Sequence, residues 1–414
     1  MRRHADFMRL WSAETISQLG TQVTLLALPL TAILVLDATP FEVGVLTALE
    51  VAPFLLVGLP AGVWVDRMRR RPLLIAGDLV RAAALGTIPL AHALGQDSMA
   101  HLYGVAFVTG VATVFFDVAY QSYLPSLVDR DRLPEGNAKL EVSRSAGALA
   151  GPSLAGALVQ LFSAPAAILV DAVSYVGSAL FVGSIRRREP PAQRPEGGHL
   201  SMRTEISSGL RFVVTHPLLR PIAACTSISN LFFSMASAVL VLFAVRDLGL
   251  SPGKIGLAFG IGNVGFLLGA LVADRAGRRL GVGRAIVGSI VLFGVSGFLP
   301  PLASETTGFA LITVAGGLGG FGTVVYNVNQ VSLRQAITPE RMLGKMNATM
   351  RFVVWGTLPL GAILGGVLEG AVGLRSTLWV TAFGGLLAVV PPVLSPVRSL
   401  VRIPELESSP QSGS

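Results

Sequence analysis

Long apolar runs separated by short polar loops dominate the chain. A window of about 19 residues finds these runs near 11–36, 43–65, 73–94, 102–122, 140–162, 165–185, 221–245, 254–273, 284–302, 308–331, 348–370 and 374–395. Because a helix of about 20 apolar residues spans the hydrocarbon core of a bilayer, the pattern predicts twelve transmembrane helices. The runs are continuous rather than alternating, which excludes a barrel of transmembrane strands.

Composition supports the same class. The chain is 52% hydrophobic and 14% charged, whereas soluble domains are about 25% charged, so we predict an all-α membrane protein. The net charge of +8 is scattered between apolar runs rather than clustered on one face, which excludes nucleic acid as a partner. The single cysteine, Cys225, excludes an intramolecular disulfide and a multi-cysteine metal site. No metal and no cofactor are expected.

Basic residues lie on one side of the predicted membrane. The loops that follow odd-numbered runs, with their flanks, hold only Arg246, Lys254 and Arg375. The opposite side carries nearly all the others, among them Arg2, Arg3, Arg9, Arg130, Arg132, Arg186, Arg187, Arg188, Arg334, Arg341, Arg398 and Arg402. Since basic loops stay in the cytoplasm, both termini are predicted to be cytoplasmic. The first run lacks a small-residue cleavage site and is predicted to be a membrane helix rather than a cleaved signal peptide.

An internal repeat divides the runs into two sets of six. The hexapeptide DRMRRR at 66–71 returns as DRAGRR at 274–279, an offset of 208. Pairs at an offset of 209 include Gln121 with Gln330, Leu124 with Leu333, Arg132 with Arg341 and Gly156 with Gly365. The chain is therefore predicted to form two pseudo-symmetric six-helix halves, 1–185 and 220–397.

The remaining segments are polar. Residues 186–219 begin RRREPPAQRPEGG, whose prolines and charges indicate a cytoplasmic linker. Within it, residues 202–214 place Ile206, Leu210, Val213 and Val214 at helical spacing, which predicts a short helix on the cytoplasmic surface. Residues 398–414 are expected to form a disordered cytoplasmic tail.

Two such halves resemble the plan of the major facilitator superfamily, in which substrate binds between the halves near the midplane. GVWVDRMRRRP resembles the superfamily's loop signature G-x-x-x-D-R-x-G-R-R, and GALAGPSLAG at 147–156 resembles the fifth-helix signature G-x-x-x-G-P-x-x-G-G of proton-driven drug exporters. The phrases LWSAETISQLG, DLVRAAALG and EISSGLRFVVTHPLLR are similar to bacterial exporters of the enterobactin-efflux and macrolide-efflux type.

This sequence departs from those signatures at three places. Arg69 stands where the loop signature has glycine, and Ala155 where the fifth-helix signature has its first paired glycine. Many drug–proton antiporters also carry an arginine in the fourth helix, but 99–128 contains none and has Asp117 instead. That part of the proton-transfer mechanism does not carry over.

The repeated aspartate and arginines predict a cytoplasmic gate. A carboxylate at a helix end can accept bonds from a neighbouring helix N-terminus, and the resemblance implies the start of the eleventh helix, near Asn347, as the partner. The expected gate residues, which close the cytoplasmic side in the outward-facing state, are Asp66, Arg67, Arg70, Arg71, Asp274, Arg275, Arg278 and Arg279. The alternative is that they only set membrane topology.

The fifth-helix motif consists of Gly147, Gly151, Pro152 and Gly156. Small residues allow close helix approach and proline permits a bend. The motif therefore has two interpretations: a role specific to antiport, or simple helix packing. Two G-x-G-x-x-G strings, at 260–265 and 317–322, lie inside apolar runs and are interpreted as helix packing rather than nucleotide sites.

Ionisable residues inside membrane helices usually have a partner or a function. The candidates for proton coupling are Glu50, Glu14, Asp117 and Arg144. Asp78 and Arg81 are expected to neutralise each other, and Arg144 to pair with Asp117. The candidates for the substrate cavity are Asn230, Asn327, Asn329 and Gln330, for which hydrogen bonding between helices is the alternative.

Together these features predict a secondary transporter. It would act as a monomer in the bacterial inner membrane and export an amphipathic small molecule, such as a drug, a macrolide or a siderophore-like compound, in exchange for protons. No P-loop is present, which leaves the proton gradient as energy source. A proton-coupled nutrient importer is the alternative. A membrane receptor or enzyme is more distant, because the sequence has no metal-spaced histidine cluster, no G-x-S-x-G elbow and no appended soluble domain.

Overall fold

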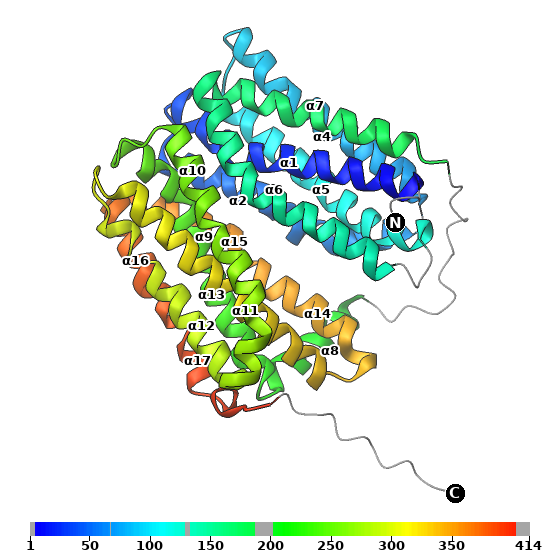
Figure 1. The fold of residues 1–414 in the computed structure, drawn as a ribbon, viewed down its shortest axis with the longest axis vertical. Helices are drawn as coiled ribbons and strands as arrows, with labels where there is room; N and C mark the ends of the chain where they lie inside the picture. Colours follow the sequence, from blue (N-terminus) through cyan, green and yellow to red (C-terminus); the bar gives the residue numbers. More distant parts are fainter. Residues whose placement is uncertain (1–4, 67, 129–132, 187–201, 403–414) are drawn as a thin grey trace, which may run out of the picture.

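The computed structural model describes residues 5–66, 68–128, 133–186 and 202–402, and within these ranges every regular element is helical (Figure 1). The first half contains α1 (Ala5–Leu34), α2 (Pro40–Leu56), α3 (Gly58–Asp66), α4 (Arg70–Ala93), α5 (Met99–Leu127), α6 (Leu133–Leu161) and α7 (Ala164–Gly183). After α8 (Met202–Thr215) come α9 (Leu219–Arg246), α10 (Pro252–Gly262), α11 (Val264–Leu280), α12 (Val282–Ser296), α13 (Gly308–Ile337), α14 (Glu340–Trp355), α15 (Thr357–Val372), α16 (Leu374–Leu387) and α17 (Val390–Val393).

The predicted runs correspond to these helices. Each run coincides with one helix or with two consecutive helical segments. Within the described ranges, 10 helical segments are long and apolar enough to cross a membrane, so the multi-pass, all-helical class is confirmed. The count of twelve crossings and the cytoplasmic position of the termini stay predictions.

Three of the runs are broken near their middle. The breaks fall at Val57 between α2 and α3, at Asn263 between α10 and α11, and at Gly356 between α14 and α15. A break frees backbone carbonyls, which must find donors because the bilayer core holds no water. Asn230 Nδ2 donates to the carbonyl oxygen of Val354 at 3.1 Å, and Asn263 Nδ2 donates to that of Ala148 at 2.5 Å. The first bond satisfies a carbonyl freed by the break at Gly356. The second lets Asn263, at the break between α10 and α11, satisfy a carbonyl of α6 that lies four residues before Pro152, whose nitrogen cannot donate.

The two halves meet at one end and diverge toward the other, where the N-terminus lies (Figure 1). At the end where they meet, called here the sealed end, one hydrophobic cluster combines Leu28 of α1 with Phe243 of α9. At the opposite, open end each half has a separate cluster, with Tyr123 in the first and Met346 in the second. Among the described residues, the hydrophobic clusters that join the halves are this one and a small one of Ala48, Ala238 and Ala362, whereas the clusters at the open end each belong to one half.

Glycine faces make the contacts at the sealed end. A Cβ on Gly44 of α2 would lie 2.6 Å from the carbonyl oxygen of Ala362 on α15, and a Cβ on Gly156 of α6 would overlap the carbonyl oxygen of Pro252 on α10. Small residues let helix backbones touch. Membrane helices associate through such contacts because the bilayer supplies no hydrophobic driving force between them. The two helix pairs α2–α15 and α6–α10 thus close this end.

An ion pair at the rim also joins the halves. Arg246 donates to Asp37 Oδ1 at 2.6 Å and to the carbonyl oxygen of Ala38 at 3.1 Å. Asp37 has φ +47°, a left-handed conformation that aspartate tolerates better than most residues. The two residues are 209 positions apart, the offset of the internal repeat, so equivalent corners of the two halves pair with each other.

The linker helix and the tail both pack on the second half. The predicted 202–214 helix is confirmed as α8, which contacts α14 and buries Val213 while Val214 stays exposed. The tail differs from the prediction in its first residues. Gly283 N donates to Leu400 O at 2.8 Å and Val282 N to Val401 O at 3.4 Å, because these carbonyls satisfy the orphan donors at the start of α12. The expected disordered tail therefore begins too early at 398; residues 403–414 lie outside the described ranges.

Gly156→Leu should push the halves apart at the sealed end, because its side chain would overlap the α10 backbone. Overpacking costs about 1–3 kcal/mol, and about 1.4 kcal/mol changes an equilibrium tenfold. Rigid halves that part at the sealed end close over the open end, where Asn327 lies between them. On a Cys225→Ser background, labelling of Asn327→Cys by a bulky charged maleimide should therefore slow by about tenfold. Gly177→Leu is the matched control, since a Cβ there meets nothing within 4 Å. Equal labelling rates in both variants would contradict the seal.

Candidate substrate pathway

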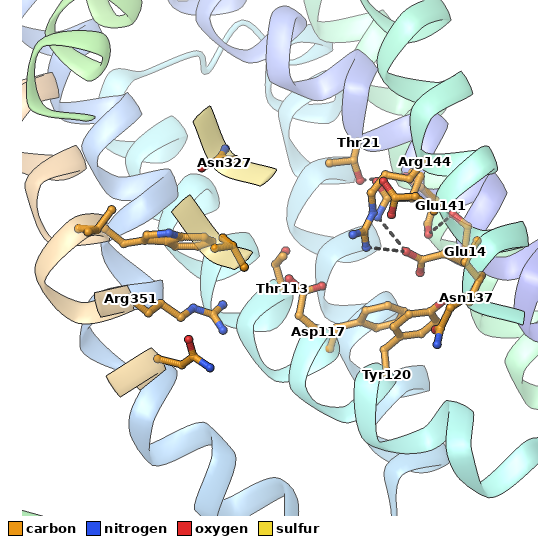
Figure 2. Close-up of a pocket in the computed structure, with 18 of the residues that line it drawn as sticks. Glu14, Thr21, Thr113, Asp117, Tyr120, Asn137, Glu141, Arg144, Asn327 and Arg351 are labelled. Atoms are coloured by element: carbon orange, nitrogen blue, oxygen red, sulfur yellow. Dashed lines mark hydrogen bonds and ion pairs between the residues drawn. The ribbon is translucent and has the colours of Figure 1, made fainter. Parts of the chain in front are cut away.

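A central cavity of about 1200 Å³ lies between the halves at the open end (Figure 2). The first half contributes Glu14, Gln18, Thr21, Thr113, Asp117, Tyr120, Asn137, Glu141 and Arg144, and the second half contributes Asn230, Asn327, Gln330, Arg334, Asn347, Arg351 and Trp355. Its volume exceeds the range of roughly 300–1,000 Å³ typical of small-molecule pockets. The cavity has room for a drug-sized compound with water around it.

Glu14 on α1 is held by two neighbours. Gln18 Nε2 donates to its Oε1 at 2.9 Å, and the Arg144 guanidinium on α6 lies 3.8 Å from the same oxygen. The predicted pairing of Arg144 with Asp117 is therefore corrected to a pairing with Glu14. The reason is packing: α6 lies along α1, so the side of α6 that carries Arg144 faces α1.

Asp117 on α5 also reaches the central cavity. No described residue forms a hydrogen bond or an ion pair with its carboxylate. Arg351 faces the cavity from α14, with its guanidinium 4.7 Å from the ring centre of Trp355 (Figure 2). The acids of the cavity lining, Glu14, Asp117 and Glu141, thus all lie on the first half's wall together with Arg144, and the charged residues that the second half contributes to this lining are the cations Arg334 and Arg351.

Three of the four predicted amides line the second half's wall. They are Asn230, Asn327 and Gln330, and Gln330 Nε2 donates to Asn327 Oδ1 at 3.3 Å. Asn329 is the exception: it is buried, and its Nδ2 donates to the carbonyl oxygens of Ala273 at 3.1 Å and Val325 at 2.9 Å. For Asn329 the structure favours the alternative of hydrogen bonding between helices.

A second, inner cavity of about 470 Å³ continues toward the sealed end and is lined by Glu50 and Asp171. Thr21, Thr113 and Tyr175 line both cavities, so the two are adjacent. Asp171 accepts hydrogen bonds from Thr24 at 2.5 Å and Ser174 at 3.1 Å.

Glu50 differs from Asp171 in having no partner. Within the described part of the chain, no side chain or backbone group forms a hydrogen bond or ion pair with its carboxylate. An unpaired carboxyl group inside a membrane helix is costly. The inner cavity thus presents one unsatisfied acid.

The predicted pairing of Asp78 with Arg81 is confirmed. Arg81 donates to Asp78 Oδ1 at 2.7 Å, and both side chains are buried. The Arg81 guanidinium also lies 4.2 Å from the ring centres of both Phe116 and Tyr175, a geometry that stabilises a desolvated cation. This pair stabilises the packing of α4 against α5 and α7.

The fifth-helix motif lies between the halves. Gly147 and Gly151 face α1, where a Cβ on Gly151 would overlap Gln22. The carbonyl oxygen of Pro152 and the backbone of Gly156 pack against Gly256 of α10. The motif therefore lets α6 touch helices of both halves.

The two G-x-G-x-x-G strings pack on each other. A Cβ on Gly262 would lie 3.3 Å from Gly316 Cα, and one on Gly265 would overlap the carbonyl oxygen of Gly317. These contacts join α10 and α11 to α13. The interpretation as helix packing is supported.

The predicted gate residues lie around the open end. Asp66 is the last residue of α3, but its side chain and all of Arg67 lie outside the described part. Arg71 donates to the carbonyl oxygens of Val182, at 3.3 Å, and Gly183 at the end of α7. Arg70 lies at the start of α4, and Arg279 lies near the end of α11.

On α11 the second copy of the motif interacts within its own helix. Arg278 and Asp274 form an ion pair at 2.5 Å, both largely exposed. Arg275 donates to the carbonyl oxygen of Leu271 at 2.8 Å. Within the described part of the first half, no residue forms a hydrogen bond or ion pair with these three side chains.

Sequence reasoning missed several residues that line the cavities. Tyr120 follows Asp117 by three positions and Glu141 precedes Arg144 by three, so each shares a helix face with a predicted residue. That spacing could have found them. Thr21 and Tyr175, whose hydroxyl oxygens lie 2.8 Å apart between the two cavities, gave no comparable signal.

The sequence model of a transport family described as transmembrane secretion effector matches residues 2–412. The chain belongs to this family, within the major facilitator superfamily. It is 26% identical over 390 residues to the multidrug efflux pump Tap of Mycolicibacterium fortuitum, covering 91% of this chain and 92% of that one. It is 20% identical to macrolide efflux protein A of Streptococcus pyogenes, covering 95% and 97%. The predicted resemblance to bacterial exporters is confirmed, and the family is a class of transporters rather than enzymes.

Solved structures share the fold. A bacterial homologue of the iron transporter ferroportin in an inward-facing state superposes with a TM-score of 0.76 at 20% identity, covering 94% of this chain and 98% of that one. A structure of a bacterial ferroportin homologue in an outward-facing state superposes with a TM-score of 0.61 at 19% identity, again covering 94% of this chain and 98% of that one. The TM-score is thus higher for the inward-facing structure than for the outward-facing one.

The Asp78–Arg81 pair generates a stability prediction. Arg81→Met should lower the free energy of unfolding by about 3–5 kcal/mol, because it leaves a buried carboxylate without its counter-charge. The double variant Asp78→Asn/Arg81→Met should recover most of that loss. Thermal unfolding of the purified proteins in detergent measures both, and a double variant as unstable as Arg81→Met would refute the pairing's role.

Proposed function

We propose that this transporter exports an amphipathic small molecule in exchange for protons, by alternating access, as a monomer in the bacterial inner membrane. The observation that carries the proposal is an unpartnered carboxylate, Glu50, beside a pathway between the halves that is sealed at one end. The efflux pumps among its relatives support the direction.

The structure corresponds to the inward-facing state in this proposal. The termini and the linker then lie in the cytoplasm, as the distribution of arginines predicts, and the central cavity opens to the same side. An exporter loads from the cytoplasm or the inner leaflet in this state. It must then break the Asp37–Arg246 pair and the glycine contacts to release substrate outside.

Proton coupling is assigned to Glu50, with Glu14 and Asp117 as further carriers. Glu50 has no counter-charge, so binding a proton or a cation is the means by which its charge is neutralised inside the membrane. Glu14 differs because Gln18 and Arg144 already neighbour its carboxylate. Protonation of Glu50 therefore changes the charge of the inner cavity without weakening an existing hydrogen bond or ion pair.

The gate residues close the cytoplasmic side in the outward-facing state in this proposal. Asp274 then exchanges Arg278 for partners at the other half, and Asp66 accepts bonds from free N–H groups at the start of α14. The sequence placed that start near Asn347, but α14 begins at Glu340, so Asn347 lies about two turns inside the helix. In the inward-facing state these contacts are open, which agrees with the ion pair inside α11.

Transport in everted membrane vesicles with an imposed pH gradient tests the function. Addition of a transported compound from a panel of macrolides, dyes, lipophilic cations and siderophores should dissipate the gradient. The wild type should accumulate that compound more than about tenfold, since one charge moved through about 100 mV releases about 2.3 kcal/mol. Glu50→Gln should reach only equilibrium, and the exposed Glu305→Gln should behave as wild type.

Two results would overturn this proposal. Gradient-driven accumulation retained in Glu50→Gln would remove the carrier. Gradient-driven movement of compounds out of everted vesicles, rather than into them, would make the protein an importer.

The gate generates a separate prediction. Asp66→Asn should abolish transport while the amount of protein in the membrane stays unchanged, because the carboxylate charge favours the helix N-terminus by about 0.3–2 kcal/mol. Asp97→Asn, at the opposite end, is the control. Wild-type transport by Asp66→Asn would leave the motif as a topology determinant only.

A further inference from the structure

A third cavity lies inside the second half. It has a volume of about 330 Å³ and is enclosed by helices α9 to α13 and α16. Five aromatic rings line it: Phe232, Phe233, Phe259, Phe266 and Phe293. We call it the phenylalanine chamber. Its volume lies at the lower end of the range of roughly 300–1,000 Å³ typical of small-molecule pockets.

The chamber connects with the rest of the pathway. Ser237, Leu240 and Phe259 line both the chamber and the inner cavity, as Thr21 and Tyr175 line both the inner and the central cavity. The three cavities therefore form one series from the open end, past Glu50, into the second half.

The chamber offers almost no free polar group. Its described lining contains no ionisable side chain. Ser296 and Thr381 donate their hydroxyl hydrogens to carbonyl oxygens of their own helices, and Asn263 donates to Ala148. A molecule inside is held by aromatic and aliphatic contact rather than by hydrogen bonds.

Glycines keep the chamber open. Gly316, Gly319, Gly320 and Gly385 are part of its lining. A Cβ on Gly385 of α16 would meet nothing within 4 Å, although the residue is buried. The empty space at Gly385 is therefore part of the chamber itself and not a helix contact.

We propose that the phenylalanine chamber binds the aromatic body of a lipophilic monovalent cation whose charge is neutralised by Glu50. This assignment rests on the proposed function and names its substrate class. Glu50 is unpartnered and shares the inner cavity with Phe259 of the chamber wall. The faces of the phenyl rings also attract a cation. The site thus joins an anion in one half to an apolar receptor in the other.

Equilibrium binding of tetraphenylphosphonium to the purified full-length protein in detergent tests the proposal. Gly385→Leu fills the chamber without a backbone clash and should raise the Kd by about tenfold or more, the scale on which apolar pockets discriminate small changes in size. Gly288→Leu is the matched control, because it lies on α12, lines none of the three cavities, and its Cβ meets nothing within 4 Å. It should change the Kd less than about twofold.

The charge is tested in the same assay. Glu50→Gln should weaken tetraphenylphosphonium by a similar factor but leave neutral triphenylphosphine oxide unchanged, whereas Gly385→Leu should weaken both. Tetramethylammonium, which lacks an aromatic body, should not compete with tetraphenylphosphonium. Thermal unfolding of each variant confirms that it is folded.

Two outcomes overturn the proposal. If Gly385→Leu and Gly288→Leu bind tetraphenylphosphonium alike, the chamber is not its site. If saturating phospholipid displaces the ligand from the wild type and Gly385→Leu removes a bound lipid instead, the chamber holds an acyl chain. Failure of the proposed export function gives a different result from failure of this binding site. In that case tetraphenylphosphonium binding would respond to these variants as described, but everted vesicles would show no gradient-driven flux.

Discussion

Backbone-to-backbone contact through glycine at the sealed end is the constraint on which the rest of the structure depends. Lipid gives membrane helices no hydrophobic reason to associate, so two bundles must be held by van der Waals contact and a few polar groups. Gly44, Gly156 and Gly256 supply that contact, and Asp37–Arg246 adds charge at the rim. Because these contacts occupy one end only, the other end can open around a cavity.

The polar groups within the helices fall into two classes. Asp78 with Arg81, Asp171 with its two hydroxyl donors, and Asn329 with its carbonyl partners each have partners within the protein. Glu50 and Asp117 are not satisfied, and both line the pathway. Since unsatisfied polar groups are costly in the membrane, the first class stabilises the fold and the second indicates function.

The sequence predicted the fold well because its signals are long and redundant. Apolar runs locate the helices, although α6 and α14 begin seven and eight residues before their runs, and the repeat at an offset near 209 divides them into halves without any knowledge of packing. It could not predict the breaks at Val57, Asn263 and Gly356, since glycine is frequent throughout these helices and only tertiary contacts show which carbonyls find other donors.

The candidate pathway was predicted less completely. Residue type alone identified Glu14, Glu50 and Asp117, because acids in apolar helices are rare. It gave the wrong partner for Arg144 and could not separate Asn327 from Asn329, two positions apart, since that separation depends on the rotation of α13 toward the cavity or toward α11. The phenylalanine chamber had no sequence signal, because its rings come from four helices and its space from glycines that also mediate packing.

The central claim is that the two ends of the pathway open alternately. Spin-label distance measurements in nanodiscs test it most directly, on a Cys225→Ser background, with one pair at Asn137 and Asn347 beside the central cavity and another at Gln96 and Glu305 in loops at the sealed end. The account predicts two distance populations at each end, changing in opposite directions as pH is varied. A single unchanging population at the central-cavity pair, or both ends opening together, would contradict it.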